Sequence, residues 1–83
     1  MHLEILTPER KIFEGEVSIA TLPGADGSFQ VLDNHAPLVS LLKEGIIEYK
    51  DKTATHTVRI TGGVAEVLSN RVMVLADGTL DSQ

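Results

Sequence analysis

Three histidines, His2, His35 and His56, are the residues of this sequence best suited to bind a metal or to transfer protons. Each is separated from the next by more than twenty positions, which matches no zinc-binding spacing, and no cysteine is present to supply a thiolate. Histidines so placed are more often hydrogen-bonded members of strands and turns than ligands. Distant residues can still converge in a fold, so a small metal-dependent enzyme stays open as one alternative hypothesis.

The other chemical groups do not form a catalytic motif either. Glu14 and Glu16 share one face of a strand and could mimic a carboxylate pair, although a solvated acidic strand edge is the simpler interpretation. The loop Gly24–Gly27 lacks the Lys-Ser or Lys-Thr of a phosphate-binding loop, and no helix pattern follows it. No serine lies in a Gly-x-Ser-x-Gly elbow; the serines are Ser18, Ser28, Ser40, Ser69 and Ser82. We therefore expect a binding or structural module without a catalytic, cofactor or metal site.

Composition narrows the possible partners. The 83 residues suffice for one small domain, and the net charge of −5 without any basic cluster argues against nucleic-acid binding. Three aromatic residues, Phe13, Phe29 and Tyr49, are too few for a stacking platform or a sugar cleft. No apolar run approaches the ~20 residues that span a bilayer, and the first residues do not resemble a signal peptide. We expect a soluble protein that reaches a membrane only through another protein.

The sequence pattern predicts that short strands position these residues. Turn residues recur every eight to twelve positions between segments rich in Val, Ile, Leu and Thr, which is typical of an all-β sandwich or barrel. The pattern predicts about nine or ten strands in two packed sheets, a domain over residues 1–77 and a loose polar tail over 78–83. The expected strands are residues 2–6, 11–15, 16–24, 28–32, 38–42, 46–50, 54–60, 64–68 and 71–76.

His35 lies in the stretch that leads into the most apolar segment. Asp33 and Asn34 are turn formers, and Pro37 favours an extended conformation at Ala36, so His35 is expected on a rigid corner. The continuous run Leu38–Leu42 is typical of a strand buried on both faces, although it could instead supply an interface.

Three sequence blocks in order resemble the N-terminal β-sandwich of the epsilon subunit of F-type ATP synthases. They are "LEILTPERKIFEGEV", "LPGADGSFQVLDNHAPLVSLLKEGII" and "ITGGVAEVLSNRVMVLAD", and together they cover Leu3 to Asp77. The most specific parts are Asn34–Leu38, with the Leu-Pro-Gly loop before it, and Gly62–Val67.

The resemblance implies a non-catalytic subunit of the central stalk, the rotor. Such a subunit binds the gamma subunit and the polar loops of the membrane c-ring, and it couples ion-driven rotation to ATP synthesis. It would lie at the cytoplasmic side of the bacterial plasma membrane as a peripheral part of the complex. The alternative is an unrelated β-sandwich module that binds a ligand or a peptide.

The resemblance also implies which residues contact partners. The loop Ala25–Ser28, with the nearby His35 corner, would look toward the c-ring, and Thr7 with the segment 35–42 would look toward gamma. Ser28 replaces an acidic residue of some members, which puts a charge pair there in doubt. His35 could be a structural donor, a partner contact or both. The implied contact residues are Thr7, Ala25, Asp26, Gly27, Ser28, His35, Pro37, Leu38, Ser40 and Leu42.

The sequence departs from most members at its end. Those members continue into a C-terminal helical hairpin that can inhibit ATP hydrolysis, whereas this sequence stops at Gln83. It is either a naturally short epsilon subunit or an isolated domain, and we expect the short form without inhibitory helices.

Overall fold

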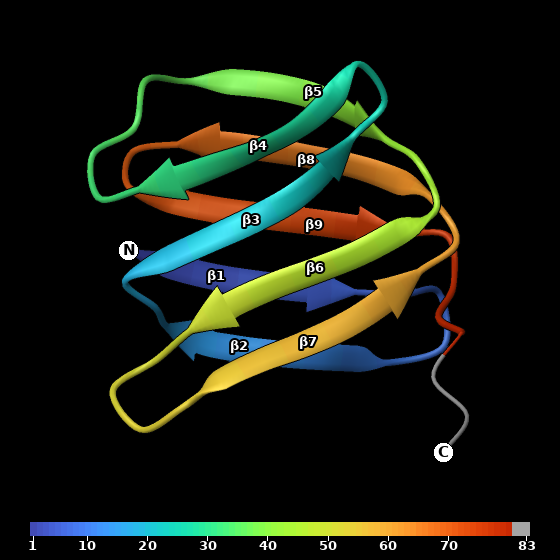
Figure 1. Cartoon of the computed structure of the whole chain (residues 1–83), viewed down its shortest axis with the longest axis horizontal. Coiled ribbons are helices and arrows are strands. Elements are labelled where there is room, and N and C mark those ends of the chain that lie inside the picture. The colour runs from blue at the N-terminus through green and yellow to red at the C-terminus, as the bar shows by residue number, and fades with distance from the viewer. Residues whose placement is uncertain (81–83) are drawn as a thin grey trace.

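The computed structural model of the chain describes residues 1–80, which form nine strands and no helix (Figure 1). This confirms the all-β prediction, and the bounds of three strands agree with the predicted ones to the residue. Residues 1–80 include no helix that is long and apolar enough to cross a membrane. The strands are β1 (His2–Leu6), β2 (Lys11–Glu16), β3 (Ile19–Gly24), β4 (Gly27–Leu32), β5 (Leu38–Leu42), β6 (Gly45–Lys50), β7 (Thr55–Ile60), β8 (Gly63–Leu68) and β9 (Arg71–Ala76).

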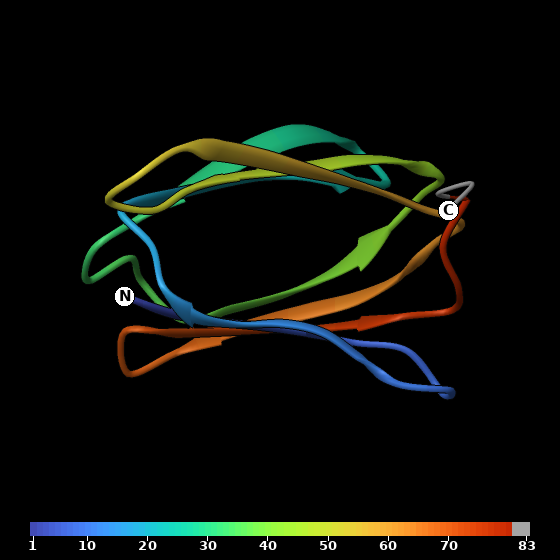
Figure 2. The same ribbon diagram turned by 90° about the horizontal axis from the view of Figure 1, so that it is seen from below.

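The expected two sheets are two layers of one curled sheet (Figure 2). One layer has the order β2-β1-β9-β8-β5, and the other is β7-β6-β3 with β4 on the free side of β3. The layers meet where Gly24 pairs with Leu42, and there Ala25 N donates to Leu41 O at 2.8 Å and Lys43 N to Pro23 O at 2.9 Å. Strands β1 and β9, the first and the last, pair in parallel, whereas every other pair is antiparallel.

The core lies between the two layers and, among the described residues, contains only hydrophobic side chains. Alternation along each strand sends every second side chain inward, and each large one contributes about 1.5–3 kcal/mol on burial. Phe13 of β2 and Tyr49 of β6 bring the layers together away from the β3–β5 joint, with ring centroids 4.4 Å apart. The largest fully buried side chains are Leu3, Ile5, Leu22, Val31, Ile47, Ile60, Val67, Val72 and Val74.

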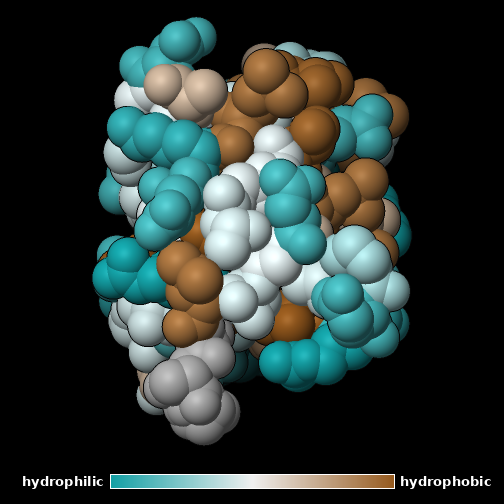
Figure 3. Space-filling view, turned by 90° about the vertical axis from the view of Figure 1, so that its right-hand side faces the viewer, coloured by the Kyte–Doolittle hydropathy of each residue, from teal (hydrophilic) through white to brown (hydrophobic). Residues whose placement is uncertain are grey.

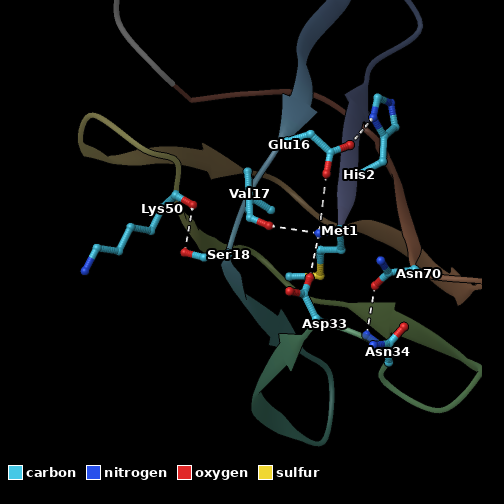
Figure 4. Close-up of polar contacts among 9 residues, drawn as sticks. All are labelled: Met1, His2, Glu16, Val17, Ser18, Asp33, Asn34, Lys50 and Asn70. Carbon is cyan, nitrogen blue, oxygen red and sulfur yellow. Dashed lines mark hydrogen bonds and ion pairs between the residues drawn. The ribbon is translucent and has the colours of Figure 1, made fainter.

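The chain changes layers at Val17 and Ser18, so β3 begins later than predicted (Figure 4). Val17 N donates to Met1 O at 2.9 Å in one layer, and Ser18 N donates to Lys50 O at 2.8 Å in the other. The Met1 amine donates to Asp33 Oδ1 at 2.6 Å and to Val17 O at 3.1 Å. The hydrogen bond to Asp33 raises the pKa of this amine, since it stabilises the charged form.

Strand β5 corrects one prediction. The run Leu38–Leu42 was expected to be buried on both faces, but Val39 and Leu41 are 71% and 66% exposed, whereas Leu42 is only 6% exposed. The physical reason is that a two-layer sandwich covers only the inner face of each layer. An apolar run in β5 therefore has half of its side chains in water.

The predicted turns are present, with one difference in detail. Asn34, Ser69 and Asn70 have φ values of 62°, 53° and 60°, which is the left-handed region that tight turns use. Gly27 also has positive φ, whereas Gly24 does not. At Gly24 the requirement is space, because a Cβ there would lie 2.5 Å from Gly27 O.

The end of the described chain is attached to β7 rather than loose. Thr79 forms a bridge with Ile60, Thr61 N donates to Gly78 O at 3.1 Å, and Leu80 N donates to Arg59 O at 3.0 Å. The expectation of a loose tail is wrong for residues 78–80, and residues 81–83 of the expected tail lie outside the described residues.

The turn between β6 and β7 is organised by Asp51. Its Oδ1 accepts hydrogen bonds from Ala54 N at 2.9 Å and from Thr53 N and Oγ1 at 2.8 Å, and His56 Nε2 lies 2.9 Å from its Oδ2. These donors, the Ala54 N–H foremost, hold the pKa of the Asp51 carboxyl far below its usual value.

We predict that Asp51→Asn destabilises the protein near neutral pH and that the difference narrows as the pH falls below about 4. A carboxyl whose pKa is lowered by folding contributes stability above its unfolded pKa, near 3.8, and this contribution is lost as the pH falls further. Urea unfolding of both proteins between pH 7 and pH 2 measures it. An equal gap between the two proteins across that range would contradict the prediction.

We also predict that Gly63→Ala destabilises the protein by about 1–3 kcal/mol. Gly63 has a φ of 151°, and a Cβ there would lie 2.3 Å from the backbone oxygen of Leu75. The control is Gly78→Ala, where the nearest atom, Thr61 Oγ1, is 3.5 Å away and the change should stay within about 0.5 kcal/mol. Equal effects of the two substitutions on the free energy of unfolding would contradict the prediction.

Candidate protein-interaction surface

The outward face of the five-strand layer carries a continuous group of hydrophobic side chains. Strand register places Leu41, Val64, Leu75 and Leu6 side by side in one row across β5, β8, β9 and β1. Val39 and Met73 lie in the next row, and Val39, Leu41 and Leu75 are among the most exposed large hydrophobic residues. Figure 3 looks at one end of the sandwich and shows hydrophobic atoms gathered mainly at the top and right of that view, with a smaller group at the lower left. We call the six residues the apolar patch: Leu6, Val39, Leu41, Val64, Met73 and Leu75.

The outward face of the other layer is more polar, although Leu32 and Ile46 are 53% and 46% exposed there. The row across its centre is Gln30, Thr21, Glu48 and Thr57, all polar. Burial of the core requires the inward side chains of both layers to be hydrophobic, but it requires nothing of the outward ones. A contiguous apolar group on one outward face of a small protein is therefore best explained by a protein partner.

The surface around the patch has shallow hollows rather than a closed cavity. One is lined by Val39, Val64, Glu66, Met73 and Leu75. A neighbouring hollow is lined by Leu6, Thr7, Pro8, Leu75, Ala76 and Asp77. A broad face with open hollows suits a protein surface better than a small ligand, which needs a cleft that encloses most of it.

Thr7 lies at the border of the patch. Its hydroxyl accepts a hydrogen bond from Arg10 N at 3.2 Å and lies 3.0 Å from Arg10 O, so it closes the β1–β2 turn. It shares a hollow with Leu75, which places it beside the patch as well. Among the expected contact residues, Thr7 thus combines a structural role with a place at the surface.

The loop Ala25–Gly27 and His35 lie at opposite ends of the sandwich. The loop lies at the start of β4 and His35 lies beyond its end. The six residues of this strand separate the two by roughly 20 Å at the usual rise per residue. The expectation that the His35 corner is near this loop is therefore wrong, because a strand carries its two ends apart. Ala25, Asp26, Gly27, Ser28 and Pro37 are all exposed.

His35 has a clear structural role at its corner. Its N–H donates to Leu32 O at 3.2 Å, and its Nδ1 lies 2.7 Å from Ala36 O. Since a carbonyl oxygen can only accept, Nδ1 carries the hydrogen in this contact. The ring is half-buried, so part of it is also open to a partner.

Three expected contact residues point inward. Leu42 is buried, Leu38 packs against the core, and Ser40 pairs with the buried Ala65 and donates from Oγ to Leu41 O at 3.1 Å. Their outward neighbours in β5, Val39 and Leu41, belong to the patch instead. Val64, Met73 and Leu75 were not expected at the surface. The signal that could have found them is that β8 and β9 carry hydrophobic residues on both faces, beside Glu66 and Arg71.

The histidines do not converge in the structure. His2 Nε2 is 3.0 Å from Glu14 Oε2. His56 pairs with Asp51 and stacks on Tyr49, with the ring centroids 5.2 Å apart. His35 is held by hydrogen bonds to backbone oxygens. Residues 1–80 contain no group of three His, Asp or Glu side chains that could hold a metal ion.

Known proteins with similar sequences share one description. Residues 1–81 match the family described as ATP synthase, Delta/Epsilon chain, beta-sandwich domain. A protein of Campylobacter curvus named ATP synthase epsilon chain is 48% identical over 81 residues, which are 96% of this chain and 63% of the relative. A protein of the same name in Caulobacter vibrioides is 39% identical over 82 residues, or 99% of this chain and 95% of the relative.

A solved structure is similar as well. A chain in the structure of the Euglena gracilis mitochondrial ATP synthase, OSCP/F1/c-ring in rotational state 1, is 25% identical with a TM-score of 0.86. The match covers 94% of this chain and 51% of that one. The chain thus spans less than two thirds of the Campylobacter relative and about half of the Euglena chain.

The patch predicts opposite outcomes for two adjacent leucines. Leu41→Asp should change the free energy of unfolding by about 0.5 kcal/mol or less, because that side chain is already in water. Leu42→Asp places a charge in the core and should cost about 3 kcal/mol or more. Urea unfolding of both variants tests this, and similar losses would show that β5 is buried on both sides.

Proposed function

The chain belongs to the ATP synthase delta/epsilon β-sandwich family, and we propose that it is a non-catalytic central-stalk subunit of an F-type ATP synthase. In this proposal it binds the gamma subunit and the polar loops of the c-ring, and it couples ion-driven rotation to ATP synthesis. It works as a peripheral part of the complex on the cytoplasmic side of the bacterial plasma membrane. Because the chain belongs to this family, the alternative of an unrelated β-sandwich module that binds a ligand or a peptide no longer applies.

The observation that carries the proposal is the apolar patch. The broad face of the molecule measures 31 by 29 Å, or roughly 900 Å², and a standard protein interface covers about 800 Å² per partner. One such contact would use this face and leave the polar face of the other layer in water. We assign the patch, with Thr7 at its border, to the gamma subunit.

The exposed loop Ala25–Ser28 supports a second contact, with the c-ring. Ala25 N is anchored on Leu41 O, so the tip of the hairpin is held by the joint between the layers. The loop is polar and carries Asp26, which suits polar loops of a ring better than an apolar partner. We assign Ala25, Asp26, Gly27 and Ser28 to this contact.

His35 and Pro37 belong to the edge of the gamma contact in this proposal. They lead into β5, whose Val39 lies in the patch. Leu38, Ser40 and Leu42 support that edge from within, because they fix the position of β5 against the core. A body held on a broad face and at one end can pass torque between two partners without any catalytic group of its own.

The test is binding to the gamma subunit of the same complex. Val39→Asp and Leu75→Asp should weaken gamma binding by roughly tenfold or more, because each places a charge in a dehydrated apolar interface. The control, Thr55→Asp, lies on the polar outward face opposite Lys50 and should leave the dissociation constant within about twofold. Isothermal titration calorimetry measures the three constants.

Two outcomes would contradict the proposal. One is a wild-type chain that does not bind gamma. The other is a pattern in which Thr55→Asp weakens binding and the two patch variants do not.

A further inference from the structure

Glu66 is a single carboxylate inside the hydrophobic surface of the five-strand layer. Its neighbours across the sheet are Val39 of β5 and Met73 of β9, and the outward residues next to it along β8 are Val64 and Leu68. It lines the hollow that opens between Val39 and Leu75. A partner that covers the apolar patch would therefore also cover this carboxylate.

Glu66 differs from the other carboxylates of this face. Lys11 forms ion pairs with Glu14 and, at 3.6 Å, with Glu4. His2 lies 3.4 Å from Glu16. Within residues 1–80, no hydrogen bond or ion pair to the Glu66 side chain is present.

Arg71 is a cation on the neighbouring strand that could in principle pair with Glu66. It pairs with Leu68 across β8 and β9, two residues along from Met73, and it lines a hollow together with Glu66. Even so, the two side chains are not within ion-pair distance in the structure.

Covering the patch would strip water from Glu66. A carboxylate that loses its water without gaining a partner is strongly unfavourable, so an interface there needs a compensating cation. Arginine suits the position best, because its planar guanidinium can bind both carboxylate oxygens and also lie against apolar side chains.

We propose that the partner which covers the apolar patch places one basic side chain, an arginine by this argument, against Glu66. This inference rests on the proposed function, in which gamma is that partner. Hydrophobic contact has no direction, so the patch alone would permit several orientations of the two proteins. The ion pair selects one of them, because only one places the cation over Glu66.

The experiment compares gamma binding of the whole chain and its Glu66→Gln and Glu66→Lys variants. Glu66→Gln should weaken binding about thirtyfold, since the partner's cation would be left dehydrated and unpaired, and Glu66→Lys should weaken it further. The matched control is Glu48→Gln, at the centre of the polar outward face, which should stay within about twofold. All variants should melt near the wild-type temperature, because both glutamates are exposed.

Arg71→Gln separates an internal cation from one that the partner supplies. If the partner supplies it, Arg71→Gln binds within about threefold of the wild type. If Arg71→Gln loses as much affinity as Glu66→Gln and the double variant loses no more, Arg71 is the cation and the inference is wrong.

The remaining outcomes distinguish this inference from the proposed function. Unchanged or tighter binding by Glu66→Gln, together with weaker binding by Val39→Asp, would overturn the ion pair and leave the gamma contact in place. Failure of the wild type to bind gamma would overturn both.

Discussion

Each layer of this sandwich has only one other layer to pack against, and the rest of the structure depends on this constraint. Alternation along the strands sends half of the side chains into the space between the layers, where hydrophobic burial holds the fold together. The other half must face water or a partner. In the layer of β4, β3, β6 and β7 these outward residues are mostly polar, whereas in the layer of β2, β1, β9, β8 and β5 many are hydrophobic.

The same constraint explains how far the sequence could predict the structure. Turn residues and short apolar segments predicted β1, β5 and β9 to the residue, because these signals are local. The exposure of Val39 could not be predicted in this way, because it depends on which side of β5 the second layer lies. The distance between the Ala25–Gly27 loop and His35 was misjudged because residues close in sequence were taken as close in space. The resemblance indicated the family. Of the contact residues that it implied, Leu42 points inward, whereas Val39 and Leu41 point outward.

The site that emerges is a surface rather than a cleft. The histidines and acidic residues that could have suggested chemistry are used in local pairs, as with His56 and Asp51 or His2 and Glu14. In the function proposed above, the patch would supply affinity and Glu66 within it would supply direction. The proposed rotor role needs both, since torque passes only through a contact whose orientation is fixed.

The parallel pairing of β1 with β9 has a consequence for how the protein is made. Strand β1 can pair early with β2, but this hairpin cannot join the rest of its layer until the last strand has been synthesised, so the five-strand layer closes only after translation has passed Ala76. Pairings of such long sequence separation form slowly, because the intervening chain must first be ordered. The apolar patch spans both sides of this seam, with Leu6 on β1 and Leu75 on β9. A nascent or truncated chain therefore lacks the complete surface, and assembly with a partner is reserved for finished molecules.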